Sequence, residues 1–147
     1  MHSKYENVRG VVIMAVWGIG AYYSGQNSPD KTAEFLAQAG AFVGWDYRNA
    51  PSLHNMLKSI KVGDIIYIKS YTIKTKSLNI KAIGIVDDIA TKTGTGLGTG
   101  IGVKWKKDFT PISVVLNDET FRNNVYNNTL YEEFDLDIIN RVIDALI

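Results

Sequence analysis

The alternation of apolar and polar positions divides the chain into strands and helices of a mixed fold. Residues 8–16 are rich in β-branched side chains and predict a buried strand. Residues 65–71 and 78–86 predict two more strands, and the short polar segment between them favours an antiparallel pair. Three shorter strands are expected over residues 41–45, 103–105 and 112–116.

Two helices are expected between the early strands. Ser28 and Pro29 form a helix start, and Gly40 marks the end of that helix. Pro51 opens the second helix. Its apolar residues follow the i, i+3, i+4, i+7 spacing of one helix face, namely Leu53, Met56, Leu57 and Ile60. The early part of the chain therefore alternates between strand and helix.

The C-terminal part predicts two more helices. Residues 118–126 form one, and Asp135 is the expected N-cap of the other. The last helix has an apolar stripe made of Leu136, Ile139, Ile143 and Leu146. Between the strands, residues 91–102 alternate glycine with threonine and other residues. This segment predicts a flexible connection, because its spacing matches neither a dinucleotide fingerprint nor a phosphate loop.

Composition narrows the class of protein. A chain of 147 residues with 46% hydrophobic content is the size of one domain with a real core. The net charge of +1 gives no global attraction for nucleic acid or membranes, so any charged binding surface must be local. Cysteine is absent, which excludes disulfides and thiolate metal sites. Neither a membrane span nor a signal peptide is expected, and the predicted location is cytoplasmic.

Catalytic motifs have little support in the sequence. The two histidines, His2 and His54, fall in no triad or metal-binding pattern. The pair Asp87-Asp88 follows a strand and fits a strand-ending turn better than a cation site. We therefore expect a protein that is not an enzyme, with no catalytic residues, cofactor or metal.

Aromatic residues gather at the predicted strand ends and in the neighbouring loops, where rings can stack on a flat base. Polar residues beside them can contact a base edge. The candidate ligand-binding residues are Trp17, Tyr22, Tyr23, Trp45, Asp46, Tyr47 and Arg48. The alternative is that the tryptophans belong to the core and the tyrosines to sheet edges.

Lysines alternate in two segments and would point to one side of a strand or hairpin. The candidate backbone or phosphate contacts are Lys74, Lys76, Lys104 and Lys106. The alternative is a solvated edge that prevents strand-to-strand association.

These residues also suggest a family. The strand end Trp17-Gly18-Ile19-Gly20, the pair Gly44-Trp45 and the helix leading into Val62-Gly63-Asp64-Ile65 are similar to the PUA-like superfamily. Within it, the chain most resembles EVE-type domains and related modules of McrBC-type modified-DNA restriction systems. The resemblance covers residues 8–116. It implies a PUA-like curved sheet or pseudobarrel. With the elements predicted above, we expect an α+β fold of about five or six strands, two early inserted helices and a helical C-terminal tail, residues 117–147, packed on the same domain.

The resemblance implies binding of RNA or of a modified base in an aromatic pocket. Our leading hypothesis is thus a non-catalytic module that recognises a modified or flipped base in DNA or RNA. One alternative is a binder of a free nucleotide or nucleotide-derived signal, in defence or phage counter-defence. Another is a structural or interaction protein, which would form a homodimer through the last helix.

Overall fold

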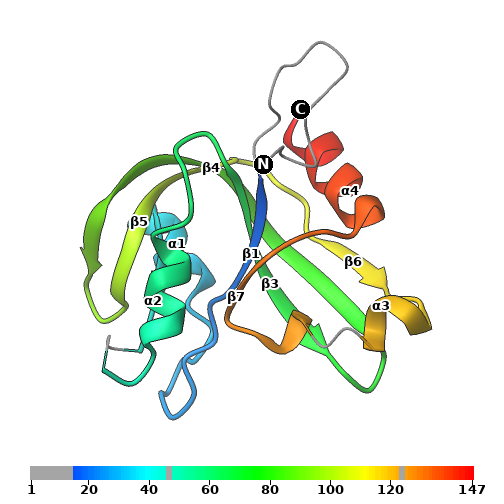
Figure 1. The fold of residues 1–147 in the computed structure, drawn as a ribbon, viewed down its shortest axis with the longest axis horizontal. Coiled ribbons are helices and arrows are strands. Elements are labelled where there is room, and N and C mark those ends of the chain that lie inside the picture. Colours follow the sequence, from blue (N-terminus) through cyan, green and yellow to red (C-terminus); the bar gives the residue numbers. More distant parts are fainter. Residues whose placement is uncertain (1–14, 46–47, 123–124) are drawn as a thin grey trace.

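The structure, a computed structural model, describes residues 15–45, 48–122 and 125–147. These residues form an α+β fold in which one seven-stranded mixed sheet curls into a half-barrel (Figure 1). The strands are β1 (Val16–Gly20), β2 (Gly40–Val43), β3 (Ile65–Thr72), β4 (Ser77–Gly94), β5 (Gly98–Trp105), β6 (Ile112–Val115) and β7 (Leu130–Glu132). The helical segments are α1 (Thr32–Ala37), α2 (Pro51–Leu57), α3 (Asp118–Arg122), the 3-10 helix η1 (Val125–Asn127) and α4 (Leu136–Leu146). The predicted α+β class with a curved sheet is confirmed.

Strand β1 lies inside the sheet, between strands that come from distant parts of the chain. It pairs parallel with β3 and antiparallel with β7, within the order β2-β5-β4-β3-β1-β7. β6 pairs with the first part of β4. The predicted antiparallel pair in the centre is confirmed as β3 and β4. Residues 117–147 contribute β7 to this sheet as well as helices.

The first predicted strand overlaps the structure only at its end, because residues 8–14 lie outside the described residues. β1 continues through Gly18 to Gly20, beyond the predicted strand end at residue 16. A Cβ atom on Gly18 would overlap the ring of Tyr131 on β7. Glycine at this position therefore lets the tyrosine ring lie directly against β1.

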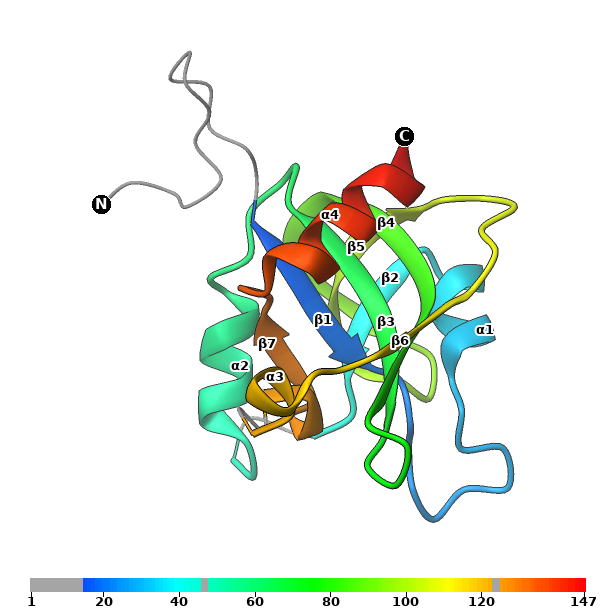
Figure 2. The ribbon, with the colours of Figure 1, turned by 90° about the vertical axis from the view of Figure 1, so that its right-hand side faces the viewer.

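Side chains of the central strands alternate between two cores, one on each face of the sheet. Trp17 on β1 faces a cluster that contains Phe35 of α1 and Leu57 of α2. The adjacent Val16 faces the second cluster, in which Ile139 of α4 is buried. Figure 2 shows α4 lying across the sheet on this second face. Because both faces are covered, the interior strands are almost completely buried.

A buried aspartate just before β3 is hydrogen-bonded to the start of β1. Asp64 is 3% exposed. Its carboxylate accepts hydrogen bonds from the indole Nε1–H of Trp17 at 2.9 Å, the backbone N–H of Lys61 at 2.9 Å and that of Ala15 at 3.2 Å. A buried carboxylate needs such donors to offset the loss of water. Asp64 therefore joins the start of β1 to the turn before β3.

The same turn is also joined to β4. Gly63 has a φ of 92°, a conformation that glycine adopts without strain. Its N–H donates to the carbonyl oxygen of Val86 at 2.8 Å, and the N–H of Val86 donates to the carbonyl oxygen of Asp64 at 2.8 Å. The Gly63-Asp64 pair thus connects β1, β3 and β4 at one end of the sheet.

The glycine-rich segment 91–102 is not a loop, which corrects the sequence prediction. It forms the end of β4, a tight turn and the beginning of β5. A Cβ on Gly100 would overlap the backbone carbonyl of Ala41, and a Cβ on Gly94 would lie 2.8 Å from the ring of Phe42. Glycine is therefore needed at positions 94 and 100, because β2 packs directly against this ribbon.

Helix ends were predicted with mixed success. α2 begins at Pro51, and Asp135 is the N-cap of α4, where its carboxylate accepts a backbone hydrogen bond of 3.1 Å. The predicted start of the first helix at Ser28 is wrong, because α1 begins at Thr32. Lys31 is the N-cap residue of α1 but makes no side-chain cap hydrogen bond, whereas the carboxylate of Asp30 accepts the backbone N–H of Thr32 at 3.0 Å.

α4 packs its apolar side on the sheet of the same chain. Ile138, Ile139 and Val142 are buried there, whereas Leu136, part of the predicted stripe, is 65% exposed. None of the helices in the described residues is long and apolar enough to cross a membrane.

Replacing Asp64 with alanine is expected to lower the free energy of unfolding by about 3 kcal/mol, since each buried donor left without an acceptor costs about 1–3 kcal/mol. Asp64→Asn keeps one carbonyl acceptor, so its free energy of unfolding should lie between those of the wild type and Asp64→Ala. Urea denaturation followed by tryptophan fluorescence measures both effects.

Asp137→Ala is the control, because Asp137 is exposed and its ion pair with Arg141 contributes less than about 1 kcal/mol. An Asp64→Ala protein as stable as this control would show that Asp64 does not hold β1 in place.

Candidate functional site

An aromatic cavity lies where the chain leaves the ends of β1 and β2. It encloses about 250 Å³. Three aromatic rings and five small or polar residues, all uncharged, line it: Tyr22, Tyr23, Trp45, Gly20, Ser24, Gln26, Gly44 and Thr129. The structure therefore brings together three of the aromatic residues that the sequence singled out.

Tyr23 forms a fixed wall of the aromatic cavity. Its hydroxyl donates to the backbone carbonyl of Leu97 at 2.5 Å, and its ring meets Phe35 edge-on, with centroids 6.3 Å apart. A Cβ on Gly44 would lie 2.8 Å from the Tyr23 ring, so glycine allows this close approach. Burial raises the pKa of Tyr23 to about 12, which keeps the hydroxyl neutral at physiological pH.

Trp45 has a hydrogen-bonded backbone carbonyl and a solvent-exposed ring. Its carbonyl oxygen lies 2.6 Å from Nε2 of His54, a buried residue on α2. A carbonyl can only accept, so Nε2 carries the proton and donates it. The side chain of Trp45 is nevertheless 58% exposed, and that of Tyr22 is 71% exposed. Both rings present surface to a molecule that enters from solvent.

Trp17 is not part of this cavity, which corrects its predicted position. It is 5% exposed, because the strand alternation of β1 turns it into the core, where Asp64 accepts its indole N–H. Arg48 is exposed and is not among the described residues that line the cavity. Asp46 and Tyr47 lie outside the described residues.

Thr129 also lines the aromatic cavity and was not among the predicted site residues. The N–H of Gly20 donates to the carbonyl oxygen of Thr129 at 2.7 Å, which joins the end of β1 to the segment before β7. This neighbourhood arises from pairing between strands that are far apart in the sequence. No local pattern marks such a residue.

A second cavity, of about 470 Å³, adjoins the end of β5. We call it the lysine cavity, since four lysines line it: Lys81, Lys104, Lys106 and Lys107. Trp105 and Phe109 also line it, and the indole N–H of Trp105 donates to the carbonyl oxygen of Gly40 at 3.1 Å. Lys104 and Lys106 were both candidate phosphate contacts, and the structure places them at the same cavity.

The other two candidate phosphate contacts lie elsewhere. Lys74 and Lys76 belong to the turn between β3 and β4. Lys76 forms an ion pair of 2.8 Å with Asp118, at the start of α3. The structure therefore divides the four predicted lysines between two separate places.

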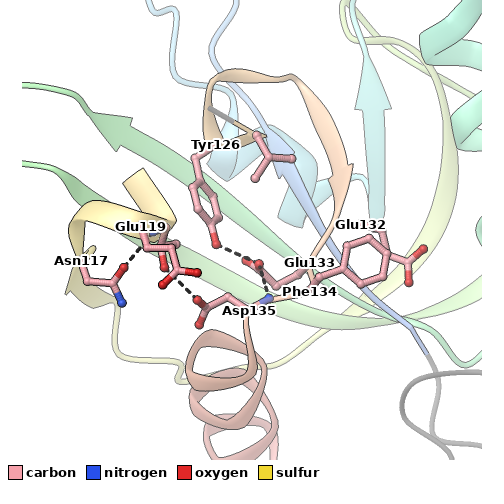
Figure 3. Close-up of a pocket in the computed structure, with 9 residues that line it drawn as sticks. Asn117, Glu119, Tyr126, Glu132, Glu133, Phe134 and Asp135 are labelled. Carbon is pink, nitrogen blue, oxygen red and sulfur yellow. Dashed lines mark hydrogen bonds between the residues drawn. The ribbon is translucent and has the colours of Figure 1, made fainter. Parts of the chain in front are cut away.

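A third cavity, of about 580 Å³, lies between α3 and the start of α4 (Figure 3). Its lining is acidic, with Glu119, Glu132, Glu133 and Asp135. Glu133 is 1% exposed, and Figure 3 shows its carboxylate receiving the hydroxyl of Tyr126, at 2.9 Å, and the backbone N–H of Asp135, at 3.1 Å.

Glu133 belongs to a polar network inside the second core. The hydroxyl of Tyr67 donates to its carboxylate at 2.6 Å, and the hydroxyl of Tyr131 lies 2.7 Å from that of Tyr67. Burial raises the pKa of Glu133, although the hydrogen bonds from the tyrosines oppose this change. These contacts give Glu133 a structural role.

Lys69 is the buried cation of the same region. It is 9% exposed, and its Nζ donates to the carbonyl oxygen of Tyr126 at 2.8 Å. It lies beside Gly20, where a Cβ would be 3.7 Å from Nζ. Burial lowers the pKa of Lys69 to about 8.

Comparisons with known proteins add little to this geometry. No protein-family model and no curated protein matches the chain. Among solved structures, the chain is similar to the NMR structure of Rpa0253 from Rhodopseudomonas palustris, a structural genomics target. The TM-score is 0.48 at 15% sequence identity, and the match covers 90% of this chain and 92% of that chain. The functional interpretation therefore depends on the cavities themselves.

The pKa of Lys69 predicts how stability changes with pH. Between pH 8 and the usual lysine pKa of about 10.4, the unfolded chain binds this proton more tightly than the folded protein. The free energy of unfolding should therefore rise with pH, by up to about 1.4 kcal/mol per pH unit. Urea denaturation at several pH values between 8 and 10 measures this slope.

Lys69→Met removes the ionisable group at similar length, so the rise attributable to Lys69 should disappear. Lys61→Met is the control at an exposed site and should keep the wild-type slope. If the free energy of unfolding changed with pH equally in the wild type and both variants, the lowered pKa of Lys69 would be contradicted.

Proposed function

We propose that the protein is a non-catalytic binding module that holds a nucleobase in the aromatic cavity. In its most specific form, the ligand is a modified or flipped base of DNA or RNA. One observation supports this most strongly: the rings of Tyr22, Tyr23 and Trp45 line one small uncharged hollow that is open to solvent.

The size of the aromatic cavity suits a single base. Its volume of about 250 Å³ is below the range of roughly 300–1,000 Å³ typical of sites for drug-sized ligands. A base stacked on an aromatic ring gains about 1–3 kcal/mol. Since Tyr23 and the backbone of Trp45 are already held by hydrogen bonds, binding loses less conformational entropy than it would with mobile walls.

The polar groups at the aromatic cavity match the edges of a base. Ser24, Gln26 and Thr129 offer hydroxyl and amide groups, which can donate to or accept from a base edge. No lysine or arginine is among the described residues that line this cavity. The cavity is therefore suited to the neutral base and not to the charged phosphate of a nucleotide.

The class of module is part of the same proposal. A curled sheet with two helices inserted between its first strands agrees with a PUA-like, EVE-type domain. Gly44 and the Gly63-Asp64 pair, which carry the resemblance in sequence, have structural roles beside the aromatic cavity and at the start of β3. These roles support the proposed class.

Trp45→Ala is expected to weaken binding of a base by roughly 5- to 150-fold, which corresponds to the loss of about 1–3 kcal/mol of stacking. Calorimetric titration measures this effect. The ligands are short single-stranded oligonucleotides with unmodified, methylated or hydroxymethylated bases, and the corresponding nucleosides.

Phe134→Ala is the matched control, because Phe134 is also 58% exposed but lines the third cavity, between α3 and the start of α4. It should bind as the wild type does. The proposed function would be wrong if no base or oligonucleotide bound, or if Trp45→Ala and Phe134→Ala gave the same affinity as the wild type.

A further inference from the structure

The lysine cavity has the charge that the aromatic cavity lacks. Its lining has four lysines and only two aspartates, Asp87 and Asp108. Lys81 is neutralised by an ion pair of 2.8 Å with Asp30, whereas Lys104, Lys106 and Lys107 form no ion pair within the described ranges 15–45, 48–122 and 125–147. A hollow with an excess of unpaired ammonium groups attracts an anion.

An aromatic wall accompanies these charges. Trp105 is half-buried, and the hydrogen bond to Gly40 holds its indole in place. Phe109 lines the same hollow. Cations beside aromatic rings are the combination with which proteins bind single-stranded nucleic acid, because the cations contact phosphates and the rings contact bases.

The two cavities share no lining residue, but one chain of contacts joins them. Tyr22, at the aromatic cavity, pairs by a backbone bridge with Asp30. The carboxylate of Asp30 then binds Nζ of Lys81, which lines the lysine cavity. Partial burial acts against the ionised form of Asp30, yet Lys81 and Thr32 lower its pKa to about 2, so this connection persists at neutral pH.

We propose that the lysine cavity binds backbone phosphate of a single-stranded nucleic acid whose base occupies the aromatic cavity. This inference rests on the proposed function and makes it more specific, because it selects a strand as the ligand in preference to a free nucleotide. A base in the aromatic cavity finds no cation in the described lining, so its strand obtains charge contacts from the separate lysine cavity.

The test is the double variant Lys104→Gln/Lys106→Gln. Binding of a labelled single strand of about ten nucleotides, within the usual range of site sizes, is measured by fluorescence anisotropy at several salt concentrations. Each lost phosphate contact lowers the slope of log affinity against log salt by about 0.7 for a single strand. We expect a slope smaller by about 1.4 and an affinity lower by about tenfold.

Lys58→Gln/Lys61→Gln is the matched control, since it removes the same charge from exposed lysines that line neither the lysine cavity nor the aromatic cavity. It should keep the wild-type slope. Binding of an uncharged nucleoside, measured by calorimetry, should be the same in both double variants. Equal losses of oligonucleotide affinity in the two variants, or no loss in either, would overturn the proposal.

Two further measurements separate this inference from the proposed function. If Trp45→Ala keeps full oligonucleotide affinity while the lysine variant loses it, the base site and its link to the lysine cavity are wrong. If the lysine variant binds the strand normally but Trp45→Ala does not, only the lysine cavity is wrong. A nucleoside monophosphate that binds as tightly as the strand would overturn the choice of a strand as ligand.

Discussion

The hydrogen bond between the indole of Trp17 and the carboxylate of Asp64 is the interaction on which the rest of the arrangement depends. It connects residues 47 positions apart and holds β1 beside β3. Asp64 accepts three hydrogen bonds, so its burial is compatible with a stable fold. Because β1 is held in this way, its far end leads directly into the aromatic cavity.

The position of an aromatic residue relative to β1 decides whether it belongs to the core or to the aromatic cavity. Trp17 lies within β1 and is buried, whereas Tyr22 and Tyr23 follow the strand and reach the aromatic cavity. Trp45 occupies the corresponding place after β2, where His54 holds its backbone. Rings inside the strands stabilise the core, and rings just beyond the strand ends remain available for a ligand.

Features that depend on local sequence could be predicted, and features that depend on distant contacts could not. The antiparallel pair β3–β4 and the cap Asp135 follow from patterns within a few residues. The glycines of segment 91–102 resembled a loop, because the packing of Gly94 and Gly100 against Phe42 of another strand is not visible in the local sequence. Similarly, Trp17 was expected at the site because the predicted strand ended at residue 16, whereas β1 continues to Gly20 and buries the Trp17 ring.

The most direct test of the base-binding account is an NMR titration of the protein with a nucleoside and with a single-stranded oligonucleotide. The account predicts nuclear Overhauser contacts between the base protons and the rings of Tyr23 and Trp45, with shifts at Gly20 and Gly44. Contacts confined to other surfaces, or ligand-induced changes that spare the aromatic cavity entirely, would contradict it.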